Sequence, residues 1–245
     1  MKILFKYATR ARPNWFQETI QTYLSMLSGM HQYEFVITCD TDDATMNNKK
    51  MISFMKKHSL YYYFGNHKTK IEAINADMKG RKFDLLIVVS DDMIPVVQRY
   101  DDIIAGHLEE FFPDTDGALH YNDGSHCGAK IISLSIMGKK LYDRFGYIYW
   151  HEYQSLWCDN EFTDIVRQLG KVQYIPEIVI KHYWMKKGRD VLYNRNEELY
   201  KIDRAVFERR GALGFPNALQ SNELQLTLKS YVKEKEICIH KKTMK

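Results

Sequence analysis

The chain has 245 residues, of which 45% are hydrophobic and 27% charged, with 17 Tyr and 12 Phe. This length and composition support one large hydrophobic core and exclude a largely disordered chain. The net charge of +4 gives a mildly basic surface that is compatible with an anionic substrate, although many proteins with such a charge bind none.

The first half of the chain alternates between strand and helix patterns. An apolar strand-like segment covers 2–8, and apolar residues from Phe16 to Leu27 then recur at helical spacing. The next predicted elements are a strand over 34–39, a helix over 46–58, a strand over 60–64, a helix over 70–78 and an apolar strand over 83–89. Such alternation predicts an α/β fold with a mostly parallel central sheet flanked by helices.

The second half is less regular. We expect a helix over 102–112, strands over 117–121 and 131–136, a helix over 139–145, a helix from Trp157 to Gly170, and strands over 172–174 and 178–182. Helical segments dominate from residue 194, and 231–245 is a mostly basic tail. We therefore predict one α/β domain over 1–185 and a helical C-terminal extension with a basic tail over 186–245.

Three polar clusters follow strands of the predicted sheet. The first is Thr9-Arg10-Ala11-Arg12-Pro13, the second is Asp40-Thr41-Asp42-Asp43, and the third is Ser90-Asp91-Asp92. Because ligands bind outside the carboxyl ends of strands in such sheets, these clusters predict one nucleotide-sized cleft. Adjacent carboxylates such as Asp91 and Asp92 can hold a divalent cation against a diphosphate, although they could also only cap a turn before Pro95.

No apolar run is long enough to span a membrane, and the N-terminus lacks the pattern of a secretory signal. The four cysteines have neither metal-site spacing nor the density of a disulfide framework. These features predict a reduced, cytoplasmic protein without a transmembrane segment. Nothing in the sequence indicates the oligomeric state.

The order of the polar motifs resembles a known family. After the clusters at Thr9, Asp40 and Ser90 come a helix that begins at Lys70, the triplet Asp159-Asn160-Glu161, and His182. This arrangement resembles the family 2 glycosyltransferases with the GT-A fold, especially their compact soluble bacterial and phage members. The resemblance covers about residues 1–185. It implies a hexosyltransferase-like enzyme that moves a sugar from a nucleotide-diphosphate donor, with a UDP-sugar favoured, and that inverts the anomeric carbon.

The resemblance also implies a Mn²⁺ or Mg²⁺ site. Asp92 is the first expected ligand, Asp91 the second, and His182 supplies an imidazole to the same cation. The family has an Asp-x-Asp triplet where this chain has Ser90-Asp91-Asp92, so Asp91 could instead contact the donor ribose. Alone, His182 would more often be an ordinary core or surface residue.

The donor would be held by the other motifs. Asp40 and Asp42 resemble the acid that accepts a hydrogen bond from the nucleobase. The remaining expected nucleotide-sugar contacts are Thr9, Arg10, Arg12, Lys70, Asn75 and Asp91. Each of these could otherwise be a solvated loop residue, and their expected position on one edge of the sheet is what favours a shared role.

Asp159 is the expected catalytic base. It stands at the start of a predicted helix, where the helix dipole and free backbone amides keep a carboxylate ionised. Such a carboxylate can take the proton of an attacking acceptor hydroxyl. An ordinary N-cap is the structural alternative, and Glu161 is the alternative base because family members carry Glu-Asp at this point.

Acceptor contacts are expected from Trp150, Trp157 and His126, because aromatic faces stack on sugar rings. Packing is the commoner role of clustered aromatic residues. The acceptor would be a surface polysaccharide or a lipid-linked glycan, or a modified DNA base if the gene belongs to a phage.

Two other functions remain open from the sequence. A sugar-nucleotide nucleotidyltransferase would share the fold and the metal, but it usually has a glycine-rich loop after the first strand, and 8–13 contains no glycine. A non-catalytic module that binds carbohydrate or nucleic acid would explain the aromatic residues and the basic tail without requiring Asp92 or Asp159.

Overall fold

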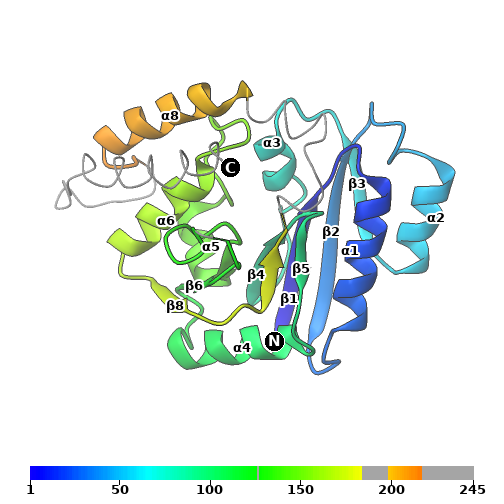
Figure 1. Ribbon diagram of the computed structural model, residues 1–245, viewed down its shortest axis with the longest axis horizontal. Coiled ribbons are helices and arrows are strands. Elements are labelled where there is room, and N and C mark those ends of the chain that lie inside the picture. The colour runs from blue at the N-terminus through cyan, green and yellow to red at the C-terminus, as the bar shows by residue number, and fades with distance from the viewer. Residues whose placement is uncertain (126, 184–197, 217–245) are drawn as a thin grey trace.

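The computed structural model describes residues 1–125, 127–183 and 198–216 (Figure 1). Its centre is a seven-stranded sheet with the order β3-β2-β1-β4-β7-β6-β8. These strands are β3 (Tyr61–Gly65), β2 (Gln32–Asp40), β1 (Lys2–Ala8), β4 (Leu85–Val89), β7 (Ile136–Gly138), β6 (Ala118–Tyr121) and β8 (Val172–Ile175). A separate two-stranded sheet pairs β5 (Met93–Pro95) with β9 (Ile180–His182).

Helices cover both faces of the central sheet. They are α1 (Pro13–Ser25), α2 (Lys49–Lys57), α3 (Lys70–Asn75), α4 (Tyr100–Phe111), α5 (Lys139–Phe145), α6 (Cys158–Gln168) and α8 (Tyr200–Ala212). In β1, Phe5 packs into a core with residues of α1, α2 and α4, whereas its neighbour Leu4 packs into a second core with residues of α3, α5, α6 and α8. This division follows from the alternation of side chains along a strand.

The strand pairings confirm the predicted α/β fold. Strands β3, β2, β1 and β4 run parallel, β6 and β8 are also parallel, and β7 is antiparallel to both β4 and β6. The carboxyl ends of β1, β2, β3 and β4 therefore meet at one edge of the sheet. Among the described residues, no helix combines the length and the apolar character needed to cross a membrane.

Two predicted elements differ from the structure. The strand expected over 131–136 is a loop that joins the sheet only at its end, where Ser135 accepts the backbone N–H of Val88 and β7 begins at Ile136. The buried Ile132 donates its backbone N–H to Oγ1 of Thr163 and not to a strand. The strand expected over 178–182 begins at Ile180 and pairs with β5, outside the central sheet. Apolar alternation indicates burial in both cases, but it does not specify the hydrogen-bond partner.

Helix α8 is the described part of the predicted C-terminal extension, and it packs against α6 and the loop before α6. The ring of Phe207 lies 5.2 Å from that of Trp157. The buried Asp203 carboxylate accepts hydrogen bonds of 2.7 to 2.9 Å from the backbone N–H groups of Gln154, Ser155 and Leu156. The domain boundary near residue 185 stays a prediction.

Candidate functional site

A cavity of about 750 Å³ lies at the carboxyl edge of the parallel strands. Its walls come from the segments after β1, β2, β3 and β4, from the loop before α6, and from β9. The sequence-predicted residues that line it are Thr9, Arg10, Arg12, Asp40, Asp42, Lys70, Asp91, Asp92, Trp157, Asp159 and His182. Residues far apart in the sequence therefore meet in one cavity, as the positions of the strand ends predict.

Asp91 is held at the end of β4 by residues of β1, of the segment directly after β1, and of α1. Its Oδ1 accepts hydrogen bonds from the Tyr7 hydroxyl at 2.8 Å and from Thr9 Oγ1 at 3.0 Å, and its backbone oxygen accepts one from Thr19 at 2.8 Å. Burial raises the pKa of Asp91 to about 7, and the Tyr7 hydrogen bond and the Arg12 charge oppose that rise. The side chain is thus held in place by the protein before any ligand is bound.

Asp92 and His182 both line the cavity, and their side chains lie close together. The Oδ2 of Asp92 lies 3.6 Å from Nε2 of His182, and its Oδ1 accepts a 2.5 Å hydrogen bond from Ser90. Pairing of β5 with β9 sets Met93 opposite His182. Next to this pair, the backbone N–H of Tyr183 donates to the backbone oxygen of Asp92 at 2.7 Å. The small second sheet therefore brings these two side chains together.

The charges around this pair shift its protonation. Burial alone would lower the pKa of His182, but contacts with the carboxylates of Asp123 and Asp92 raise it to about 9. Burial would likewise raise the pKa of Asp92, but the His182 and Ser90 contacts hold it well below its usual range. At neutral pH and without a cation, Asp92 is therefore ionised and His182 is protonated, so a cation that takes both as ligands must displace the proton on Nε2 of His182.

Asp92 and His182 fit a small divalent cation. Mg²⁺ and Mn²⁺ accept oxygen ligands, Mn²⁺ also accepts imidazole, and bonds of about 2.1 Å allow two ligand atoms to lie up to about 4.2 Å apart. The 3.6 Å separation is within that reach. Within the ranges that the structure describes, no group of three or more His, Cys, Asp or Glu is arranged to hold a metal ion. A cation here would take its remaining ligands from water or phosphate.

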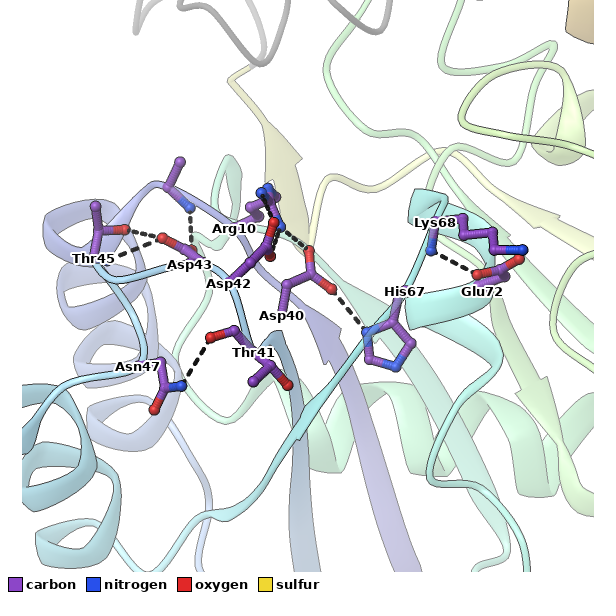
Figure 2. Close-up of polar contacts among 11 residues, drawn as sticks. Arg10, Asp40, Thr41, Asp42, Asp43, Thr45, Asn47, His67, Lys68 and Glu72 are labelled. Carbon is purple, nitrogen blue, oxygen red and sulfur yellow. Dashed lines mark hydrogen bonds and ion pairs between the residues drawn. The ribbon is translucent and has the colours of Figure 1, made fainter.

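At the other end of the cavity, Arg10 bridges two acidic side chains (Figure 2). Its Nη1 donates to Asp40 at 2.7 Å and to Asp42 at 2.6 Å, and its Nη2 donates to Asp42 at 2.9 Å. These contacts raise the pKa of Arg10, which stays charged. The second oxygen of Asp40 lies 2.8 Å from Nδ1 of His67, so both of its oxygens are engaged within the protein.

His67 lines the cavity, and sequence reasoning missed it. It follows the edge strand β3, and its ring packs over Gly65, where an added Cβ would lie 2.5 Å from the ring. The pattern that could have indicated it is a glycine at the end of a predicted strand, Gly65, with a histidine two residues later. The contact of His67 with Asp40, 27 positions earlier in the chain, has no counterpart in any sequence pattern.

Asn75 does not line the cavity. Its Oδ1 accepts the backbone N–H groups of Ile148 and Tyr149 at 2.9 and 3.1 Å, and its Nδ2 donates to the Tyr149 oxygen at 2.6 Å. The side chain therefore links α3 to the loop that follows α5. Lys70, at the other end of α3, does line the cavity.

The two candidate bases lie on different sides of α6. Asp159 stands in the first turn of the helix and lines the cavity, and its Oδ1 accepts the backbone N–H of Asn160 at 2.9 Å. Glu161 is 2% exposed and contacts Arg210 and Tyr153 in the interior. Of the two, only Asp159 lines this cavity.

Of the residues expected to contact the sugar acceptor, one lines the cavity and another does not. Trp157 lines the cavity, where it is buried against the rings of Tyr200 and Phe207. Trp150 lies outside the cavity, with its ring 3.8 Å from the Arg210 guanidinium carbon. His126 lies outside the described residues.

No protein-family model matches the sequence, and no curated protein matches it. Several solved structures are similar in fold. The mannosyltransferase PcManGT from Pyrobaculum calidifontis, in complex with GDP-Man and Mn²⁺, gives a TM-score of 0.58 at 13% identity over 83% of this chain and 60% of that chain. TarS 1–349 from S. aureus gives 0.56 at 13% identity over 94% of this chain and 77% of that chain. Its complex with UDP-GlcNAc gives 0.58 at 12% identity over 83% and 66%.

This chain has the GT-A fold. It spans less than two thirds of the PcManGT chain, and at 12 to 13% identity the likeness establishes the fold alone. In this GT-A fold, the cavity lies at the carboxyl ends of the strands from β1 to β4, with Asp91 and Asp92 directly after β4.

Proposed function

We propose that this chain is a metal-dependent glycosyltransferase of the family 2 type. It would transfer a sugar, with inversion, from a nucleotide-diphosphate donor to a hydroxyl group of a glycan or a lipid-linked acceptor. The observation that carries the proposal is the pairing of Asp92 with His182 at a cavity that also contains Asp159, in a GT-A fold. A UDP-sugar is the favoured donor.

The dimensions of the sheet edge suit such a donor. From β4 to β3 there are three strand spacings, or roughly 14 Å at about 4.8 Å each. An extended nucleoside diphosphate can span this edge, with its diphosphate near Asp92 and its base near Asp40 and His67. Arg12 and Lys70 line the same cavity and supply positive charge for the phosphates.

A cation held by Asp92 and His182 would neutralise the diphosphate as it leaves. Asp91, fixed by Tyr7 and Thr9, would then contact the donor ribose or the cation. Because Asp91 and Asp92 are adjacent and belong to a turn anchored on both sides, the donor would meet a rigid site. Rigid positioning lowers the entropic part of the barrier.

The proton and the electrons can be followed through the transfer. The Asp159 carboxylate takes the proton of the acceptor hydroxyl as its oxygen bonds to the anomeric carbon. The bond from that carbon to the diphosphate oxygen breaks on the opposite face, and the electron pair leaves with the diphosphate. Asp159 stands in the first turn of α6 and lines the cavity, where an acceptor hydroxyl can approach it.

Donor cleavage tests the proposal. Wild-type protein incubated with UDP-sugars or GDP-sugars and Mn²⁺ should release the nucleoside diphosphate, and EDTA should stop the release. Asp92→Asn should lower this rate at least about 100-fold, because the cation that neutralises the leaving diphosphate would lose a charged ligand. Asp143→Asn, at an exposed carboxylate on α5, is the matched control. Metal-independent cleavage that also survives Asp92→Asn would overturn the proposal.

A further inference from the structure

His182 lies between two carboxylates that come from different segments. Its Nε2 is 3.6 Å from Asp92 Oδ2, and its Nδ1 is 3.6 Å from Asp123 Oδ2. Asp123 follows β6 and is not among the site residues expected from the sequence. The backbone N–H of His182 donates to the backbone oxygen of Asp123 at 2.9 Å, so main chain and side chain both join these two residues.

The Asp123 side chain is itself held firmly. It is 4% exposed, its Oδ1 accepts the backbone N–H of Ser125 at 2.8 Å, and its Oδ2 accepts the Ser133 hydroxyl at 2.5 Å. Gly128 packs against it, since a Cβ at that position would lie 2.7 Å from Asp123 Oδ1. The loop is therefore built around this carboxylate, which leaves it little freedom to turn.

We propose that Asp123 is a positioning residue that orients the His182 imidazole and keeps its proton on Nδ1, so that Nε2 is directed to the cation site beside Asp92. This inference rests on the proposed function. A carboxylate behind a metal-binding histidine fixes both the ring and its tautomer, and its loss typically weakens metal binding about 10- to 100-fold. Asp123 acts here through His182, because the imidazole ring separates its Oδ2 from Asp92.

Mn²⁺ binding measures this role without an activity assay. In the full chain with saturating UDP, the electron paramagnetic resonance signal of free Mn²⁺ gives the dissociation constant. We expect Asp123→Asn to raise it about 10- to 100-fold. Asp101→Asn is the matched control, because Asp101 is also a buried carboxylate that accepts a serine hydroxyl and a backbone N–H, and it lies on α4 outside the cavity. The control should bind Mn²⁺ like the wild type.

A double-mutant cycle separates a positioning role from direct ligation. In a His182→Ala background, Asp123→Asn should change the Mn²⁺ dissociation constant less than about twofold, because its effect passes through the imidazole. An equal loss in both backgrounds would make Asp123 an independent ligand and overturn the inference. Unchanged Mn²⁺ binding in Asp123→Asn alone would also overturn it.

Two reference variants keep this test distinct from that of the proposed function. Asp92→Asn and His182→Ala should each weaken Mn²⁺ binding, and failure of both would remove the cation site itself. If Asp123→Asn fails to fold, wild-type protein labelled with ¹⁵N-histidine and loaded with UDP and Mg²⁺ still gives an answer by NMR. A proton on Nδ1 of His182 supports the inference, and a proton on Nε2 overturns it.

Discussion

The carboxylate of Glu161 and the guanidinium of Arg210 form a buried ion pair that joins α6 to α8. Two hydrogen bonds connect them, at 2.7 Å from Nη2 to Oε1 and at 2.8 Å from Nε to Oε2, and both side chains are 3% exposed. The Tyr153 hydroxyl donates to the same carboxylate at 2.8 Å. This buried ion pair, in which both carboxylate oxygens of Glu161 accept hydrogen bonds from Arg210, therefore attaches α8 to the domain.

Removing one member of this pair should destabilise the protein strongly. Arg210→Met leaves Glu161 as a buried carboxylate without its cation, so we expect the free energy of unfolding to fall by about 3 to 5 kcal/mol. Lys140→Met, which breaks the solvent-exposed pair with Asp114, is the control and should change the free energy of unfolding far less than Arg210→Met does. Urea denaturation at pH 7 measures both. Equal losses in the two variants would contradict a structural role for the buried pair.

The base assignment makes a different prediction for α6. Asp159→Asn retains the size of the side chain but cannot take a proton, so UDP binding should stay within about twofold of wild type while transfer falls about 10² to 10⁴-fold. Calorimetry with UDP and Mn²⁺ measures the first quantity, and a transfer assay with saturating donor measures the second. Unchanged turnover would assign the base elsewhere. Parallel loss of UDP binding would instead make Asp159 a donor-binding residue.

Much of the fold and part of the site could be predicted from sequence because both follow from regular periodicity. The alternation of strand-like and helix-like segments along the chain indicated the strands from β1 to β4. Neighbouring parallel strands place their carboxyl ends on one edge of the sheet. The meeting of Thr9, Asp40 and Asp92 around one cavity follows from that rule. No knowledge of individual contacts was needed for it.

Contacts between loops could not be predicted in the same way. His67 and Asp123 lie in segments without periodicity, and their partners are 27 and 59 positions away in the chain. Glu161 shows a related limit at short range. Side chains two positions apart on an α-helix differ in direction by about 200°, so Asp159 and Glu161, which are separated only by Asn160, point to opposite sides of the helix. One faces the cavity, and the other faces the interior.

His67 should contribute to donor binding. Asp40 engages its Nδ1 at 2.8 Å, which leaves Nε2 to hydrogen-bond a ligand in the cavity. We expect His67→Ala to weaken UDP binding up to about tenfold, the loss of one hydrogen bond. His31→Ala is the matched control, because His31 pairs with Asp102 outside the cavity, at 3.1 Å. Equal UDP affinity in the two variants would exclude this contact.

The buried Lys6 should make stability depend on pH. Lys6 is 0% exposed on β1, and its ammonium donates to Thr38 Oγ1, which in turn donates to Asp77 at 2.6 Å. Burial lowers the pKa of Lys6 from 10.5 to about 8, although the Asp77 charge opposes that shift. Between pH 8 and pH 10.5 the unfolded chain therefore keeps a proton that the folded chain has lost.

In that window the free energy of unfolding should rise with pH, because the unfolded state binds more protons than the folded state. The Lys6 contribution amounts to up to about 3 kcal/mol over the whole range. Urea denaturation gives the free energy of unfolding of wild type and Lys6→Met at pH 7.5, 8.5, 9.5 and 10.5. The difference between the two proteins isolates the Lys6 contribution, because all other titratable groups are present in both. Lys2→Met, at a partly exposed lysine on the same strand, serves as the control. A difference between wild type and Lys6→Met that stays constant from pH 7.5 to 10.5 would show that the Lys6 ammonium remains charged in the folded protein.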